Sequence, residues 1–116
     1  MKNILLADDS HFMRMLLKRK LDANYFSIIA EAVNGLEAIE KYKNFNPDIV
    51  LMDVTMPIVS GTDALKEIIR YDQHAKIVMC SALGTQPLIK ESLRLGAKDF
   101  IVKPFFDNLN KILNNH

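Results

Sequence analysis

The sequence predicts an α/β fold in which helices cover both faces of a five-stranded parallel sheet. Short runs of branched aliphatic residues, such as Ile49 to Met52, recur along the chain and are typical of buried parallel strands. Stretches with helical apolar periodicity separate these runs. No linker interrupts the alternation, and 116 residues are the length of one domain.

The first half of the chain contains three expected strands and two expected helices. The strands are Ile4 to Ala7, Ser27 to Val33 and Ile49 to Met52. The helices run from Ser10 to Asp22, with Asp9 or Ser10 as N-cap, and from Gly35 to Asn44, before the break at Asn46-Pro47. Their expected inward-facing residues are Met13, Leu16, Leu17 and Leu21, followed by Leu36, Ile39 and Tyr42.

The second half repeats the alternation. Strands are expected at Ile77 to Cys80 and Ile101 to Val102. Helices are expected from Thr62 to Asp72, from a cap at Thr85 to a stop at Gly96, and after a cap at Asp107. Their expected inward residues are Leu65, Ile68 and Ile69, and in the last helix Leu109, Ile112 and Leu113. Right-handed crossovers between parallel strands then place helices on both faces.

Composition narrows the functional classes. A net charge of +1 gives no overall attraction to nucleic acid. No apolar stretch reaches the roughly 20 residues of a membrane span, and no signal peptide precedes the first strand. The single cysteine, Cys80, excludes an internal disulfide and is expected to be buried. We therefore expect a cytoplasmic protein without membrane insertion.

Polar residues follow four of the expected strands. Asp8 and Asp9 follow the first, Asp53 the third, Ser81 the fourth and Lys103 the fifth. In an open parallel sheet, the functional crevice lies beyond the carboxyl ends of the strands. The sequence therefore predicts three carboxylates, a hydroxyl and an ammonium group on one rim, a set that suits a divalent cation and a phosphoryl group.

The acidic pair indicates a metal site. Adjacent carboxylates in a confined site repel each other unless a cation is present. Hard oxygen ligands suit Mg²⁺ or Mn²⁺ better than zinc. The simpler interpretation is that Asp9 caps the first helix and Asp8 is solvated.

Asp53 is the candidate nucleophile. A carboxylate can attack phosphorus and form an acyl phosphate, while a metal and a cation offset the charge. Lys103 is the candidate cation, and Ser81 offers a hydroxyl donor. Taken singly, Lys103 is better explained by a structural ion pair and Ser81 by a turn, but the two together favour the phosphoryl site. A cis peptide is predicted between Lys103 and Pro104, which would direct the lysine into the crevice.

Together these motifs resemble the receiver domains of two-component response regulators. They are Asp8-Asp9, Asp53 with Met56-Pro57 and Gly61, Ser81-Ala82, and Lys103-Pro104. The resemblance covers the whole chain and is closest to stand-alone chemotaxis receivers. It implies one receiver domain over residues 1–116, without an output domain, and a flavodoxin-like sheet of order 2-1-3-4-5.

The resemblance also implies roles for the rim residues. Asp53 would be the phosphoacceptor, and Ser81 and Lys103 would contact its phosphoryl group. Mg²⁺ would bind to Asp8, Asp9, Asp53 and the backbone carbonyl of Thr55. Ser81 and Phe100 would form the conformational switch, although phenylalanine lacks the hydroxyl of the tyrosine often found there.

Partners follow from the same resemblance. A histidine kinase or phosphotransfer protein would donate the phosphoryl group, and a downstream protein would bind the fourth helix, fifth strand and fifth helix. The chain would be a signalling domain that assists only its own phosphotransfer and dephosphorylation, as a monomer or a phosphorylation-dependent dimer, with no nucleic acid bound. The basic residues Arg14, Lys18, Arg19 and Lys20 suggest a solvated helix face or, alternatively, a docking surface for an acidic kinase.

Three alternatives remain open. The chain fits a receiver cut from a multidomain regulator, for example one that binds DNA. An aspartyl-nucleophile phosphohydrolase needs a second aspartate two residues after the nucleophile, and this chain has Thr55 there. A structural interaction domain with a vestigial acidic rim is the third.

Overall fold

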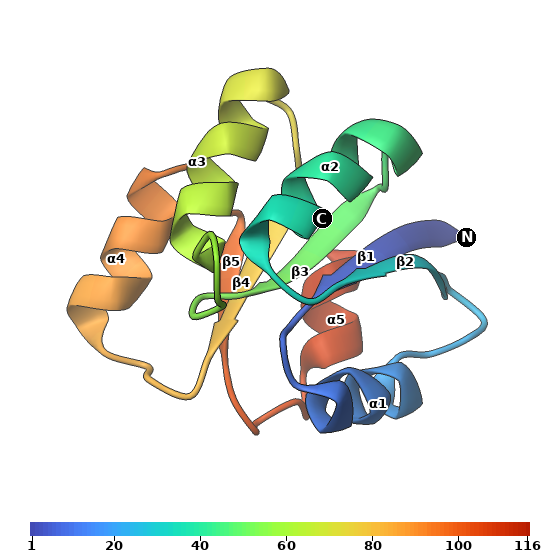
Figure 1. The fold of residues 1–116 in the computed structure, drawn as a ribbon. Coiled ribbons are helices and arrows are strands. Elements are labelled where there is room, and N and C mark those ends of the chain that lie inside the picture. Colours follow the sequence, from blue (N-terminus) through green and yellow to red (C-terminus); the bar gives the residue numbers. More distant parts are fainter.

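The computed structural model describes residues 1–116 and contains a single sheet with helices on both faces (Figure 1). The sheet has five parallel strands in the order β2-β1-β3-β4-β5, as predicted. The strands are β1 (Lys2–Ala7), β2 (Phe26–Ala32), β3 (Ile49–Asp53), β4 (Ile77–Ser81) and β5 (Asp99–Val102).

Five helices alternate with these strands. They are α1 (His11–Lys20), α2 (Gly35–Phe45), α3 (Gly61–Tyr71), α4 (Gln86–Arg94) and α5 (Leu109–Asn114). Helices α2, α3 and α4 cover one face of the sheet, and α1 and α5 cover the other (Figure 1). The prediction of a doubly wound α/β fold is confirmed.

Side-chain alternation in the strands creates two apolar layers. Leu5 of β1 belongs to the core under α2, α3 and α4, whereas its neighbours Ile4 and Leu6 belong to the core under α1 and α5. Successive residues of a strand point to opposite faces, so a strand covered on both sides is apolar throughout. This explains the unbroken aliphatic runs in the three central strands, β1, β3 and β4.

Helix α1 begins and packs as predicted. Ser10 is its N-cap, and the Ser10 hydroxyl accepts a hydrogen bond from the backbone N–H of Met13. Leu17 and Leu21 are buried in the second core, which Met13 and Leu16 cover in part. The cap places the two residues before it, Asp8 and Asp9, in the β1–α1 loop.

Two predictions about helices were wrong. Leu36 is 44% exposed, because the buried stripe of α2 runs through Gly35, Ala38 and Tyr42, and Leu36 lies off that stripe. The N-cap position of α5 is Asn108 rather than Asp107, and its side chain makes no capping hydrogen bond. The preceding turn ends instead with the Leu109 N–H bonded to the Phe106 carbonyl.

Gly61 brings α3 against the end of β3. A Cβ atom at Gly61 would lie 1.7 Å from the carbonyl oxygen of Asp53, so only glycine fits this contact. The Gly61 N–H also donates to the Val54 carbonyl at 2.8 Å. The start of α3 therefore fixes the backbone that carries Asp53.

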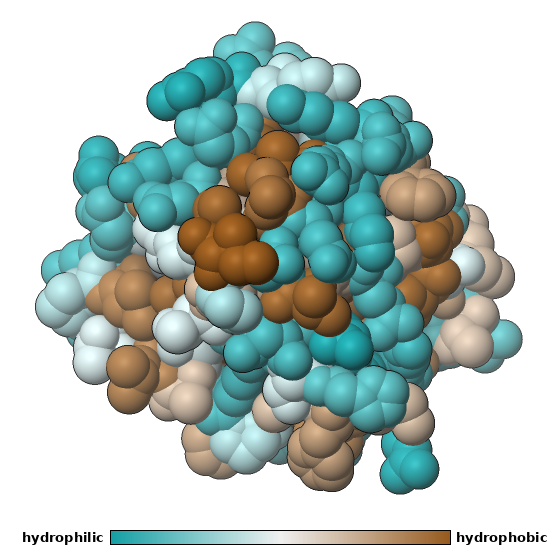
Figure 2. Space-filling model, in the orientation of Figure 1, coloured by the Kyte–Doolittle hydropathy of each residue, from teal (hydrophilic) through white to brown (hydrophobic).

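The surface is largely hydrophilic on the face shown in Figure 2, with apolar side chains gathered between α2 and α3. None of the helices is long and apolar enough to cross a membrane. At the end of α4, Gly96 adopts a φ of +111°, which accounts for the predicted stop there.

Candidate functional site

The carboxyl ends of β1 and β3 lie side by side and bring three acids together. Ala7 pairs with Met52, so the residues that follow them, Asp8 and Asp53, are neighbours. One carboxylate oxygen from each of Asp8, Asp9 and Asp53 lies within 4.8 Å of the others. Asp8 is buried, Asp53 is partly buried and Asp9 is exposed at the mouth. Burial thus decreases from Asp8 to Asp53 to Asp9, and the acidic cluster opens to solvent at Asp9.

Lys103 links two of these acids. Its Nζ lies 2.6 Å from Oδ2 of Asp8 and 3.1 Å from Oδ1 of Asp53. The peptide bond between Lys103 and Pro104 is cis, as predicted. The second carboxylate oxygen of Asp8 accepts a hydrogen bond from the Ser10 N–H at 2.9 Å. Both oxygens of Asp8 are therefore held by the protein.

The site carries more negative than positive charge, and this affects the pKa values of its groups. Burial raises the pKa of the Asp53 carboxyl; Lys103 opposes this effect, and the charges of Asp8 and Asp9 add to it. Burial works against the charged form of Lys103, but its ion pairs with Asp8 and Asp53 raise its pKa above the ordinary value. Lys103 is the only cation that forms an ion pair with the carboxylates of Asp8 and Asp53, so negative charge is in excess. Three hard carboxylate donors with excess negative charge fit a divalent cation such as Mg²⁺.

Ser81 lies next to this cluster at the end of β4. Ser81 is buried and follows Cys80, which pairs with Asp53 in the sheet. Its hydroxyl oxygen accepts a hydrogen bond from the Leu83 N–H at 3.0 Å, and its carbonyl accepts one from the Lys103 N–H at 2.8 Å. The hydroxyl is thus engaged in its own turn and has no hydrogen bond to the acids.

Phe100 and Thr55 occupy different environments. Phe100 is partly buried and packs against the core under α2, α3 and α4, beside Met79 of β4. Thr55 lies two residues beyond Asp53 in the β3–α3 loop and is exposed. The structure therefore brings Asp8, Asp9, Asp53 and Lys103 into one cluster. Ser81 lies next to it at the end of β4, and Phe100 lies on the neighbouring strand β5.

The basic residues of α1 are not a uniformly solvated face. Arg14 and Lys18 form ion pairs with Glu31 of β2 at 2.9 and 2.5 Å. Arg14 also donates from Nη1 to the backbone carbonyl of Asp8 at 2.7 Å. Neither Arg14 nor Glu31 is among the residues that the sequence predicts for the rim. The sequence feature that could have identified Arg14 is its position one helical turn after the cap Ser10, which directs its side chain toward the β1–α1 loop.

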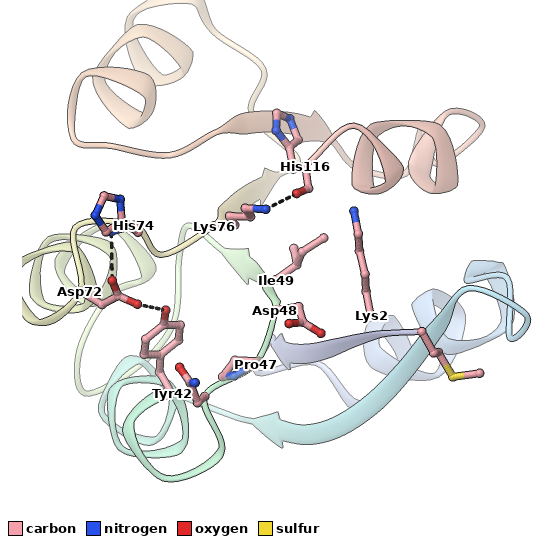
Figure 3. A pocket seen from close by; sticks show the side chains of 11 residues that line it. Lys2, Tyr42, Pro47, Asp48, Ile49, Asp72, His74, Lys76 and His116 are labelled. Carbon is pink, nitrogen blue, oxygen red and sulfur yellow. Dashed lines mark hydrogen bonds between the residues drawn. The ribbon is translucent and has the colours of Figure 1, made fainter.

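A cleft lies at the other end of the strands, near their amino ends (Figure 3). This cleft of about 490 Å³ is lined by residues that include Lys2, Tyr42, Asp72 and Lys76. Its polar groups bond to the protein itself: the Tyr42 hydroxyl donates to Asp72 at 2.7 Å, and Lys76 donates to the carbonyl of His116 at 2.5 Å. These groups already satisfy one another, so the acidic rim is the better candidate site.

Comparisons with known proteins agree with the geometry. Residues 4–114 match the response regulator receiver domain family. The chain is 50% identical to the chemotaxis protein CheY of Thermotoga maritima over 116 residues, which cover 96% of this chain and 97% of that protein. It is 51% identical to the CheY of Bacillus subtilis over 116 residues, with the same two coverages.

Solved structures give the same result. A chain of the CheX–CheY–BeF3–Mg²⁺ complex from Borrelia burgdorferi is similar, with a TM-score of 0.88 and 43% identity over 97% of this chain and 84% of that one. The response regulator TrrA of T. maritima, in complex with Mg²⁺ and BeF, has a TM-score of 0.87 and 34% identity over 99% and 98% of the two chains. From its sequence, fold and acidic rim, this chain belongs to the response regulator receiver domain family.

Proposed function

We propose that Asp53 accepts a phosphoryl group from a histidine kinase or a phosphotransfer protein, and that the phosphorylated chain controls a downstream protein. Receiver domains are phosphorylated on an aspartate in two-component signalling, and they are signalling domains rather than enzymes in the ordinary sense. Here the chain assists only its own phosphotransfer and dephosphorylation.

The observation that carries the proposal is the environment of the Asp53 carboxylate. It lies at an open rim, 3.1 Å from the ammonium group of Lys103 and within 4.8 Å of the carboxylates of Asp8 and Asp9. A nucleophilic carboxylate beside a fixed cation and a set of metal ligands is what phosphoryl transfer requires. A structural ion pair alone would not need the two additional acids.

We propose Mg²⁺ as the metal of this site, with Mn²⁺ as a substitute. Asp8, Asp9, Asp53 and the carbonyl of Thr55 would hold it, and solved relatives carry Mg²⁺ with a beryllium fluoride. When bound, Mg²⁺ supplies positive charge that offsets the phosphoryl oxygens. The excess negative charge and the absence of histidine or cysteine among the donors support this choice.

The chemistry of this chain's residues is a single displacement. An oxygen of Asp53 attacks phosphorus, the new oxygen–phosphorus bond forms, and the nitrogen–phosphorus bond of the donor phosphohistidine breaks. The departing imidazole takes up a proton. Lys103 exchanges part of its pairing with Asp8 and Asp53 for the phosphoryl oxygens, and it keeps them aligned.

We propose that Ser81 and Phe100 transmit the conformational change from the phosphorylation site to the protein surface. In this proposal the Ser81 hydroxyl turns from its own loop and donates to a phosphoryl oxygen. The movement opens space behind it for Phe100, and the surface of α4, β5 and α5 changes shape for a partner. Because Phe100 lacks a hydroxyl, its effect on that surface is one of packing.

A stand-alone chemotaxis or motility regulator is the form we propose. The chain covers 97% of the length of the relatives named CheY in T. maritima and B. subtilis. A receiver within a longer regulator remains the alternative, and the mass of the protein isolated from its own cells distinguishes the two. The cytoplasmic location, the monomer or phosphorylation-dependent dimer, and the lack of nucleic-acid binding remain predictions.

The proposal is tested by the intact mass of the protein after incubation with acetyl phosphate, with and without Mg²⁺. We expect one phosphoryl adduct that needs Mg²⁺, is removed by hydroxylamine and does not form on the Asp53→Asn variant. Thermal unfolding of that variant controls for its folding. An adduct on the folded variant, or none on the wild type with any phosphodonor and metal, would reject Asp53 as the phosphoacceptor.

A further inference from the structure

Two groups hold the backbone of Asp8, one on each side. Its N–H donates to the carbonyl of Ala32 on β2 at 3.0 Å, and its carbonyl accepts from Nη1 of Arg14 at 2.7 Å. That carbonyl belongs to the peptide unit that joins Asp8 to Asp9. The orientation of this peptide plane sets the direction in which the Asp9 side chain leaves the loop.

The two acids depend on this peptide to different degrees. The carboxylate of Asp8 has its own partners, the Ser10 N–H and the Lys103 ammonium group. The exposed carboxylate of Asp9 is in no ion pair, and its place in the acidic cluster follows from the backbone that carries it. Any group that holds the peptide therefore acts mainly on Asp9.

The Arg14 side chain is held in place by the protein and can therefore orient the Asp8–Asp9 peptide. Its side chain is only 12% exposed, and its Nε donates to Oε1 of Glu31 at 2.9 Å. The planar guanidinium thus bridges a carboxylate on β2 and a carbonyl in the β1–α1 loop with two different nitrogens. A lysine ammonium is a single point charge on a flexible stem and does not reproduce this fork.

We propose that Arg14 is a positioning residue of the metal site, which holds the Asp8–Asp9 peptide so that the Asp9 carboxylate faces Mg²⁺. This inference rests on the proposed function, because it assumes that the acidic cluster binds the metal. Groups that orient metal ligands typically alter metal affinity by about 10- to 100-fold when they are removed.

The sign of the effect separates positioning from simple electrostatics. Arg14 carries a positive charge near a cation site, so removal of the charge alone would strengthen Mg²⁺ binding. Loss of positioning would weaken it. The two explanations thus predict opposite changes in the dissociation constant.

Lys18 provides the matched control. It lies one turn further along α1 and pairs with the same carboxylate, at 2.5 Å from Oε2 of Glu31, but the structure gives it no contact with Asp8. Lys18→Met removes a cation and a partner of Glu31 while the carbonyl contact stays. Arg14→Met removes the carbonyl contact as well, and Arg14→Lys keeps the charge without the fork.

The experiment measures the Mg²⁺ dissociation constant by isothermal titration calorimetry on the wild type and the three variants, each shown to be folded by circular dichroism. We expect Arg14→Met and Arg14→Lys to weaken binding by about 10-fold or more, and Lys18→Met to leave it unchanged or slightly stronger. A folded Arg14→Met variant that binds as tightly as the wild type overturns the inference, as does equal weakening in Lys18→Met.

The wild-type titration distinguishes this inference from the proposed function. If the wild type binds no Mg²⁺, the proposed metal site is rejected, and the role of Arg14 is rejected together with it. If the wild type binds Mg²⁺ and the Arg14 variants match it, only the role of Arg14 is rejected. Should Arg14→Met fail to fold, Arg14→Lys decides the question by the same criterion.

Discussion

Ile58 is an unusual residue in the loop that follows Asp53. It is a β-branched residue with a φ of +70°, and its side chain is 78% exposed. The Val59 N–H bonds to the Pro57 carbonyl at 2.8 Å, so Ile58 is the central residue of a γ-turn. A positive φ brings the Cβ atom close to the backbone and is unfavourable for a β-branched residue such as isoleucine.

We predict that Ile58→Asn stabilises the protein. Asparagine tolerates a positive φ better than a β-branched residue does, and little buried surface is lost at so exposed a side chain. The expected gain is about 1 kcal/mol in the free energy of unfolding, measured by urea denaturation. Ile58→Val keeps the branched Cβ and should show no gain. A lower midpoint for Ile58→Asn than for the wild type would show that the turn is not strained.

The acids of the site illustrate what is predictable at the scale of a residue. Asp8 and Asp53 could be placed at the rim because each follows a buried strand, and strand ends meet at one edge of a parallel sheet. The contact between Arg14 and the carbonyl of Asp8 could not be predicted. It depends on the rotamer of a long side chain and on the distance between a helix and a loop.

Among the elements, α2 and α3 are joined by polar and aromatic contacts at their carboxyl ends. The hydroxyl of the buried Tyr42 of α2 donates a hydrogen bond to the carboxylate of Asp72, the residue that follows α3, at 2.7 Å. The rings of Tyr42 and Tyr71 meet edge to face, with centroids 6.4 Å apart. The hydrogen bond from Tyr42 lowers the pKa of Asp72, and burial raises the pKa of Tyr42.

We predict that Tyr42→Phe destabilises the protein at neutral pH, by about 1 kcal/mol for one lost hydrogen bond. The lowered pKa of Asp72 makes this contribution fully present above the carboxyl group's ordinary pKa. It is lost as the pH falls through the lowered pKa. The difference between variant and wild type should therefore shrink below about pH 4.

Urea denaturation at neutral and acidic pH measures this difference. Tyr71→Phe is the control, because the Tyr71 hydroxyl does not bond to Asp72 and its ring is retained. A difference between Tyr42→Phe and the wild type that persists unchanged into acid would contradict the role of the Asp72 charge.

For the whole molecule, the site concentrates unfavourable charge where two central strands end. Both faces of the sheet are buried under helices, and this packing holds β1 and β3 together despite the repulsion among three carboxylates. Such sites commonly reduce the stability of a fold in exchange for function. A ligand that binds only the folded state restores stability by mass action.

We predict that Mg²⁺ stabilises the whole fold. At a Mg²⁺ concentration 100 times the dissociation constant, the free energy of unfolding should rise by about 2.7 kcal/mol, and EDTA should reverse the gain. In Asp53→Asn the metal effect should be smaller, because a ligand charge is lost, while the metal-free variant should be at least as stable as the wild type. Thermal unfolding in NaCl of equal ionic strength is the control. A midpoint that does not respond to Mg²⁺ would contradict the metal site.

The sequence by itself determined the alternation of strands and helices, the class of the fold and the rim on which Asp8, Asp9, Asp53 and Lys103 meet. These follow from local periodicity and from a topological rule that brings the ends of parallel strands together. The resemblance to receiver domains then supplied the strand order, which the structure confirms.

Only the tertiary structure decided which side chains touch. It exposed Leu36, engaged the Ser81 hydroxyl with the Leu83 N–H, and joined Tyr42 to Asp72. It also separated Arg14, which reaches the site, from the other basic residues of α1. The physical reason is that periodicity specifies which face a residue occupies, whereas a contact between elements depends on how closely they pack and which rotamers that packing allows.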